Sequence, residues 1–374
     1  MWYNLGGERM TEDLKNILLK IIDNGFEAYI VGGYVRDFLL GYESTDIDIC
    51  TNALPKNLIE IFDGDNISVS SYGSIKLRSN KYNVDITTYR KEISYINGKL
   101  SEIEYINDIE TDIQRRDFTI NALYMDIDGN IIDKVNGKQD INDKIIHVIG
   151  DINKKFKEDP LRILRALRFK ITLGFDLDNE IVEYIHNNKN EIIKISNQRK
   201  KEEINKMLVS KNVVNGFDYL KNLQILDLLG FSYNNLIYVD DINGMYAQLN
   251  FNDDYPLTKE EKDNIEGIKE ILDYKMIDYG ILFKYGLYLS LVAGKILEID
   301  KVAINELYSR MPIKNSKELD IDGDDIQNIL NIEPSKIIKD ITDDLIFLVL
   351  NKKLENKNDI LKQYILDNKG MWLE

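Results

Sequence analysis

The first fifty residues alternate short apolar runs with turn residues, and each run has the period of a defined element. Between residues 11 and 24 the apolar side chains recur at helical spacing, which predicts an amphipathic helix that ends at Gly25. Residues 28–31 form a short apolar run that predicts a strand. The glycine pair Gly32-Gly33 predicts a turn, residues 34–40 a short helix, and residues 45–50 a second strand.

The rest of the chain changes character near residue 156. Residues 67–90 predict three more strands, and the segment "DIETDIQRRDFTINALYMD" predicts a helix over 108–126. From Phe156 to the C-terminus the pattern is mostly helical, with an acidic surface loop expected over 239–256. The expected fold class is α+β, with a mixed sheet and helices at the N-terminal end followed by an elongated all-helical remainder.

Two aspartates interrupt the second strand at alternate positions. Because side chains alternate faces along a strand, Asp46 and Asp48 share one face while Ile47 and Ile49 point into the core. Such a pair can be a polar strand edge or a site for divalent cations. Asp85, in another expected strand, adds a third carboxylate, and this arrangement favours phosphoryl or nucleotidyl transfer with two metal ions.

Composition limits the chemistry further. The chain holds one cysteine, Cys50, and two histidines, which excludes a disulfide framework and a cysteine-based zinc site. A metal ion would therefore have to bind through oxygen ligands, which favours Mg²⁺ over Zn²⁺. No run approaches the roughly 18 apolar residues of a membrane span and no signal-peptide pattern is present, so we expect a soluble cytoplasmic protein without membrane contact. Translation could start at Met1 or Met10.

The net charge of −16 argues against nucleic acid as a partner when taken alone. The charge is uneven, however. Between residues 154 and 206 there are 13 Lys and Arg against 9 Asp and Glu, a local excess of positive charge. A basic strip of this kind can hold a phosphate backbone on an otherwise acidic protein.

Three blocks together resemble one known family: "VGGYVRDFLLGYESTDIDICTNALP", "RRDFTINAL" and "EDPLRILRALRF". They are similar to the motifs of the bacterial class II tRNA nucleotidyltransferase and poly(A) polymerase family, within the polymerase-β-like nucleotidyltransferases. A weaker match is "SNQRKKEEINKML", where Gln198 stands in place of the family's glutamate. An N-terminal extension is expected over 1–10, since Met10 is also a plausible start. The resemblance implies a catalytic head over 11–146, a neck for nucleobase recognition over 147–209, a helical body over 210–297 and a tRNA-binding tail over 298–374.

The resemblance also implies roles for individual residues. Asp46 and Asp48 would bind two Mg²⁺ ions, and Asp85 is added as a catalytic carboxylate mainly on the strand argument. Gly33 would let a backbone amide approach phosphate. The remaining contacts to the triphosphate and sugar would come from Arg36, Arg116, Asp117 and Asn121. Asp117 could instead cap a helix, and Asn121 could form a buried hydrogen bond.

The segment "EDPLR" is expected to read the base. On a helix, Asp159 and Arg162 would share a face, and an acceptor beside an arginine fork suits the pairing edges of cytosine and adenine. The alternative is that Asp159 caps the helix ahead of Pro160. Arg165 would reach the triphosphate. The candidate RNA contacts are Lys154, Lys155, Arg168, Arg199 and Lys200.

The expected activity is the addition of C, C and A to the 3′ end of tRNA from CTP and ATP without a nucleic-acid template. The loop between Arg90 and Arg115 looks full length, which favours complete CCA addition. Alternatives are a CC-adding or A-adding enzyme, a bacterial poly(A) polymerase, and a non-catalytic RNA-binding relative. Either a monomer or a homodimer is expected.

Overall fold

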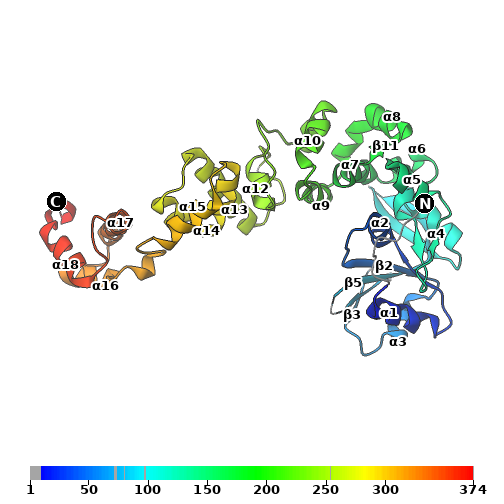
Figure 1. The fold of residues 1–374 in the computed structure, drawn as a ribbon, viewed down its shortest axis with the longest axis horizontal. Coiled ribbons are helices and arrows are strands. Elements are labelled where there is room, and N and C mark those ends of the chain that lie inside the picture. The colour runs from blue at the N-terminus through cyan, green and yellow to red at the C-terminus, as the bar shows by residue number, and fades with distance from the viewer. Residues whose placement is uncertain (1–9, 71–73, 80, 97, 253, 374) are drawn as a thin grey trace. The chain divides into compact units, whose positions relative to one another are not determined.

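The chain divides into two compact units, Met1–Gly230 and Phe231–Glu374. The computed structural model describes residues 10–373, apart from 71–73, 80, 97 and 253 (Figure 1). Of the expected N-terminal extension over 1–10, only Met10 therefore lies within the described residues. The finer division into head, neck, body and tail stays a prediction.

A seven-stranded mixed sheet forms the centre of the first unit (Figure 1). Its strand order is β3-β4-β5-β2-β1-β8-β9. β2 pairs with β5 in parallel and with β1 in antiparallel orientation. The strands are β1 (Ala28–Val31), β2 (Asp46–Thr51), β3 (Ile67–Val69), β4 (Ile75–Arg78), β5 (Asn83–Thr88), β8 (Tyr124–Met125) and β9 (Ile131–Ile132).

The elements expected over residues 11–90 are confirmed. α1 (Glu12–Ile22) buries its apolar stripe, with Leu14, Leu18 and Ile21 fully inaccessible. α2 (Gly33–Leu40) follows β1 through Gly32 and ends at Gly41, and α3 (Pro55–Ile61) follows β2. Because β1 runs antiparallel to β2, with Val31 opposite Asp48, the N-terminus of α2 lies beside the first residues of β2.

Two expectations between residues 90 and 126 are wrong. The expected loop is a β-hairpin of β6 (Arg90–Ile96) and β7 (Lys99–Tyr105). The expected long helix stops early, because α4 (Ile109–Arg115) is followed by a 3₁₀ turn, η1 (Thr119–Asn121), and by β8. Tyr124 pairs with Val31 of β1 and is fully buried, so sheet pairing overrides the helical period there.

Helices make up most of the remainder of the first unit. α7 is the central one: Ile163, Leu164 and Leu167 are fully buried, and it packs against α9. The elements are α5 (Gly137–Asp143), β10 (Ile145–Ile146), α6 (Ile152–Glu158), α7 (Leu161–Leu173), β11 (Asp176–Leu177), α8 (Asn179–Asn188), η2 (Lys189–Lys194), α9 (Asn197–Leu208), α10 (Val213–Asn222) and α11 (Ile225–Leu229).

The second unit is helical. The surface loop expected over 239–256 is wrong in part, because it contains α12 and buries Tyr246 and Tyr255 against Phe231. Among the described residues, no helix is both long and apolar enough to cross a membrane. The elements are α12 (Ile242–Ala247), α13 (Lys259–Tyr274), α14 (Tyr279–Ile296), α15 (Lys301–Ser309), η3 (Ser316–Glu318), α16 (Gly323–Leu330), α17 (Lys336–Leu350), α18 (Asn358–Asp367) and α19 (Gly370–Leu373).

Candidate active site

Three carboxylates gather where β2 and β5 run side by side. Ile47 and Ile49 of β2 are 1% exposed and point into the core, so Asp46 and Asp48 project from the other face. Asp48 is the direct register partner of Asp85 on β5. Asn83, one strand position before the buried Val84, donates to Asp46 Oδ1 at 3.1 Å. The strand pattern thus places two aspartates in solvent and a third beside them.

Gly32 makes room for one of these carboxylates. Its φ of +83° lies in the region that favours glycine, and a Cβ at this position would lie 3.0 Å from Asp48 Oδ2. The net pKa of Asp48 is raised. Desolvation by the surrounding protein raises it most, Arg116 lowers it, and the nearby Asp85 and Asp46 carboxylates raise it further. A cation bound beside Asp48 would offset its repulsion from the Asp85 and Asp46 carboxylates.

The donor atoms around Asp48 suit a divalent cation that also binds substrate phosphates. Asp85 Oδ1 is buried and has no hydrogen-bond partner among the described residues. In the part of the chain that the structure describes, no cluster of three or more His, Cys, Asp or Glu side chains could by itself hold one ion. Mg²⁺ commonly binds through one or two carboxylates together with substrate phosphates and water. Asp46 and Asp48 fit that mode.

Arg36 on α2 links the glycine turn to η1. Its Nη1 donates to Asn121 Oδ1 at 2.7 Å, and its Nε and Nη2 donate to Asp37 Oδ1 at 2.9 and 2.7 Å. Arg36 and Asn121 are each 9% exposed. Two residues predicted to contact the nucleotide, 85 positions apart in sequence, therefore hold each other in place.

Arg116 is fixed by a buried carboxylate. Asp112 of α4 is 0% exposed and accepts from Arg115 Nε at 2.7 Å and Arg116 Nη2 at 2.9 Å. Arg116 Nε also donates to the Tyr124 hydroxyl at 2.8 Å. Burial acts to raise the pKa of Asp112, but the two arginines outweigh it, so the net pKa is lowered and the carboxylate stays charged.

Asp117 and Arg165 form a second ion pair, with Arg165 Nε 2.5 Å from Asp117 Oδ2. Burial acts to raise the pKa of Asp117, and Arg165 lowers it by more. Phe169 lies one turn after Arg165 on α7. Its ring centroid is 5.3 Å from the guanidinium carbon of Arg36 and 5.8 Å from that of Arg165. The alternative that Asp117 caps a helix is not what the structure shows.

Asp159 lies between α6 and α7, not on a helix as expected. Its Oδ1 accepts from the Leu161 amide at 3.1 Å, which is the capping contact considered for it. Arg199 of α9 grips both oxygens, with Nη1 to Oδ1 at 3.1 Å and Nη2 to Oδ2 at 2.8 Å. A carboxylate offers about four acceptor positions, and these contacts occupy three. The capping contact therefore does not exclude a contact to a base.

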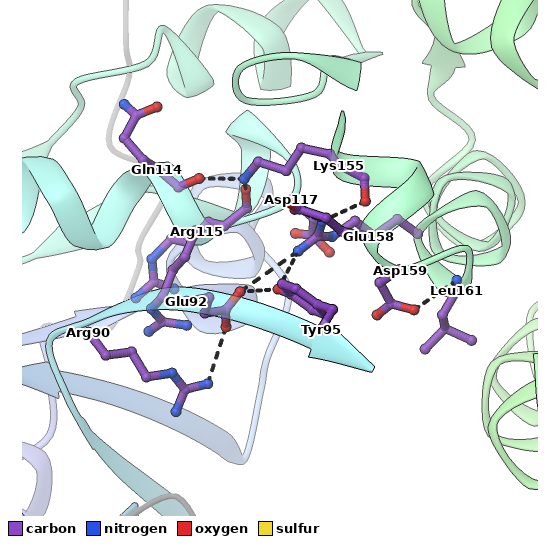
Figure 2. Close-up of polar contacts among 12 residues, drawn as sticks. Arg90, Glu92, Tyr95, Gln114, Arg115, Asp117, Lys155, Glu158, Asp159 and Leu161 are labelled. Carbon is purple, nitrogen blue, oxygen red and sulfur yellow. Dashed lines mark hydrogen bonds and ion pairs between the residues drawn. The ribbon is translucent and has the colours of Figure 1, made fainter. Parts of the chain in front are cut away.

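Arg162, in the first turn of α7, is 6% exposed. Its Nη1 donates to the Lys155 carbonyl at 2.7 Å and its Nη2 to the Tyr95 hydroxyl at 3.0 Å. Glu92 Oε2 lies 3.9 Å from Nη2 and accepts a hydrogen bond from Tyr95, so both hairpin residues face the guanidinium (Figure 2). A guanidinium has five N–H groups, and these bonds use two of them.

One cavity of about 750 Å³ brings these groups together. Eight arginines and six carboxylates line it, which suits a polyanionic ligand bound beside cations. Twelve of the predicted site residues line it: Gly33, Arg36, Asp46, Asp48, Arg116, Asp117, Asn121, Asp159, Arg162, Arg165, Arg168 and Arg199. Asp85 instead lines an adjoining cavity of about 480 Å³, which also contains Asp46 and Asp48.

Comparison with known proteins connects this geometry to a family. Residues 28–147 match the model of the poly A polymerase head domain, and residues 174–230 match a probable RNA- and SrmB-binding site of polymerase A. Residues 255–365 match a putative tRNA nucleotidyltransferase domain 2. The CCA-adding enzyme of Staphylococcus haemolyticus is 31% identical over 97% of this chain and 99% of its own length. This chain belongs to the CCA-adding enzyme family.

Two further CCA-adding enzymes are similar to this chain in sequence or in fold. The CCA-adding enzyme of Staphylococcus epidermidis is 29% identical over 95% of this chain and 97% of its own. The fold of a Bacillus stearothermophilus CCA-adding enzyme, solved in complex with CTP, superposes with a TM-score of 0.84 at 23% identity, covering 97% of this chain and 99% of that one. The expected fold class, family and enzyme class, a tRNA nucleotidyltransferase, are therefore confirmed.

The basic residues expected at the surface of this CCA-adding family member are mostly internal. Lys154 is exposed, with 76% of its side chain accessible. Lys155 and Lys200 are 9% and 7% exposed, and burial lowers the pKa of both. Arg168 pairs with Glu203 at 2.5 Å, and Arg199 with Asp159. The expectation of RNA contacts took these charges to lie in solvent, and for Lys155 and Lys200 that premise is wrong.

Several site residues of this nucleotidyltransferase were missed. Arg90, Glu92 and Tyr95 line the cavity from the hairpin, and Phe169 lies beneath the arginines. The hairpin residues fall outside the recognised blocks. The signal that could identify them is strand alternation, because the two-residue spacing of Arg90 and Glu92 places them on one face of a hairpin strand. Phe169 stood in a recognised block but had no polar group to suggest a role.

Proposed function

We propose that this chain adds C, C and A to the 3′ end of tRNA from CTP and ATP, without a nucleic-acid template. In each step the 3′-hydroxyl oxygen attacks the α-phosphorus of the nucleotide, and pyrophosphate leaves. The observation that supports this most directly is that one cavity of about 750 Å³ is lined both by Asp159 with Arg162 and by Asp46 with Asp48.

The pair of Asp159 and Arg162 has the polarity of a base reader. One acceptor position of Asp159 is left by the contacts described, and it can accept from the exocyclic amine of cytosine or adenine. The N–H groups of Arg162 can donate to cytosine O2 and N3 or to adenine N1. Uracil and guanine present a carbonyl where Asp159 needs an amine, so they would leave a buried acceptor unpaired.

The triphosphate would contact the arginines that line the same cavity. Arg36 and Arg165 are already held by Asn121 and Asp117, so little side-chain entropy is lost when they contact phosphate. Two Mg²⁺ ions held by Asp46 and Asp48 would neutralise phosphate charge and lower the pKa of the attacking hydroxyl. Asp85, the register partner of Asp48, would add a third carboxylate beside the two metal ligands, and Lys76 Nζ lies 3.8 Å from its Oδ2.

Transfer RNA is the proposed acceptor, and the cytoplasm, where tRNA matures, the proposed location. A CCA-adding enzyme of Thermotoga maritima complexed with tRNA superposes with a TM-score of 0.64 at 20% identity. That structure supports a fold able to hold tRNA. The expectation of a monomer or a homodimer stays a prediction.

Asp46→Asn tests the catalytic assignment. The change keeps the side-chain volume but removes one negative charge from the cation site, so incorporation of CTP into tRNA lacking CCA should fall by at least about a thousandfold. Binding of tRNA in a filter assay should not change. Asp63→Asn, at an exposed position after α3, is the matched control and should stay active. Undiminished incorporation by Asp46→Asn would refute the assignment.

A further inference from the structure

Lys155 is a lysine of α6 whose charge is turned inward. The residue is 9% exposed, although its neighbours Lys154 and Lys157 are exposed. Its ammonium donates to the Arg116 carbonyl at 2.5 Å and also to the Gln114 carbonyl (Figure 2). Both carbonyls belong to the end of α4, where helix carbonyls have no partner within the helix. The lysine therefore fixes the turn from which Arg116 and Asp117 project.

The main chain of Lys155 holds a second part of the site. Its carbonyl accepts from Arg162 Nη1 at 2.7 Å. One residue thus joins the Arg116-Asp117 turn to the arginine that would read the base, across 39 positions of sequence on one side and 7 on the other. Lys155 is not among the residues that line the cavity proposed to hold the nucleotide, so its ammonium does not contact the nucleotide directly.

We infer that Lys155 is a positioning residue for nucleotide binding: its side chain holds the Arg116-Asp117 turn while its carbonyl holds Arg162, so the phosphate contacts and the base contact keep a fixed separation. The inference rests on the proposed function. It assigns Lys155 a role inside the site, in place of the RNA contact expected from its charge.

The charges around Lys155 make this role sensitive to pH. Burial and the positive Arg162 lower the pKa of Lys155 to about 8, against the opposing effect of Asp117, Glu92 and Glu158. As pH rises through 8 the ammonium loses its charge, and its bonds to the two carbonyls weaken. The unfolded chain keeps its proton up to about pH 10.4, so this group favours the folded state as pH rises from 8. Titration of Lys155 in this window therefore does not itself promote unfolding.

Steady-state constants of three variants test the inference. Lys155→Met removes the ammonium and should raise KM for both CTP and ATP about tenfold, the cost of about one charge-assisted hydrogen bond, while KM for tRNA stays within about twofold. Lys155→Arg can still donate to two carbonyls and should restore KM to within about threefold. Lys56→Met, the same change at an exposed position of α3, is the matched control.

The pH profile separates positioning from a merely structural role, and needs only proteins that fold. Between pH 7 and 9.5 the wild-type KM for CTP should rise, whereas Lys155→Arg, which stays charged, should show a flatter profile. Titration of nucleotide and tRNA is common to both and cancels in their ratio. Parallel profiles, or an unchanged KM in Lys155→Met, would overturn the inference. Absence of any CTP or ATP incorporation by the wild type would instead refute the proposed function.

Discussion

Replacing Arg199 by lysine tests whether this arginine serves the nucleotide or the RNA. In the structure its guanidinium grips both oxygens of Asp159 and also donates to the Gly98 carbonyl at 2.8 Å. Lysine keeps the positive charge but is a single point donor, so it cannot reproduce the two parallel bonds. The variant therefore removes the orientation of Asp159 while leaving the charge of the surface unchanged.

The size of the expected effect depends on how exposed the Arg199–Asp159 pair is. The side chains of Arg199 and Asp159 are 23% and 14% exposed, so the pair lies between a surface pair, worth up to about 1 kcal/mol, and a buried charged contact, worth about 1.5–3 kcal/mol per bond. Loss of the fork should cost about 2 kcal/mol of base-contact energy, or roughly thirtyfold in KM for CTP and ATP. Discrimination against UTP should weaken as well, because a loosely held Asp159 no longer enforces an amine partner.

The assay is single-nucleotide incorporation with nucleotide and tRNA varied separately. The account predicts higher KM for nucleotide, reduced CTP over UTP preference and an unchanged KM for tRNA. Lys20→Arg is the control, since Lys20 and Asp65 form an exposed pair in the head at 2.6 Å, with 49% and 32% of their side chains exposed. If Arg199→Lys raised KM for tRNA and left the nucleotide constants alone, Arg199 would be an RNA contact and the reasoning refuted.

Two further substitutions test the supports of the site. Asp112→Asn should lower the free energy of unfolding by about 3 kcal/mol at pH 7 in urea titrations, because it leaves two largely buried arginines, whose side chains are 14% and 12% exposed, without their carboxylate. Since the pKa of Asp112 is lowered in the fold, that difference should shrink as pH falls below about 4; a constant difference would contradict the ion-pair explanation. Gly32→Ala places a Cβ 3.0 Å from Asp48 Oδ2 at a φ of +83°, so kcat should fall at least tenfold with tRNA binding retained, and full kcat would show that this glycine is not required.

The sequence was most informative where local period and burial agree. The apolar runs of α1, β1, α2 and β2 each have one period, and the strand alternation of Asp46 and Asp48 follows from it. The same alternation correctly places Val84 and Ile86 in the core and so brings Asp85 beside Asp48. Ten residues predicted for catalysis or nucleotide binding line one cavity, together with Arg168 and Arg199, which were predicted as RNA contacts.

Prediction failed where distant partners decide the outcome. The helix expected through residue 126 ends at Arg115, because Tyr124 pairs with β1, which lies about ninety residues earlier in the chain. Lysines are usually exposed, so we expect Lys155 at the surface, but its ammonium is buried and donates to carbonyls 39 and 41 positions away. Asp159 was expected on a helix, and its partner Arg199 lies on α9, 40 positions on. No local pattern encodes such contacts.

The central claim, ordered addition of C, C and A, is tested most directly on three tRNA substrates that end before CCA, after the first C and after CC. Each is offered one of the four nucleotides with Mg²⁺, and products are resolved at single-nucleotide length. The account predicts that CTP extends the first two, that ATP extends only the third, and that growth then stops. Runs of A on any 3′ end, or no incorporation at all, would contradict it.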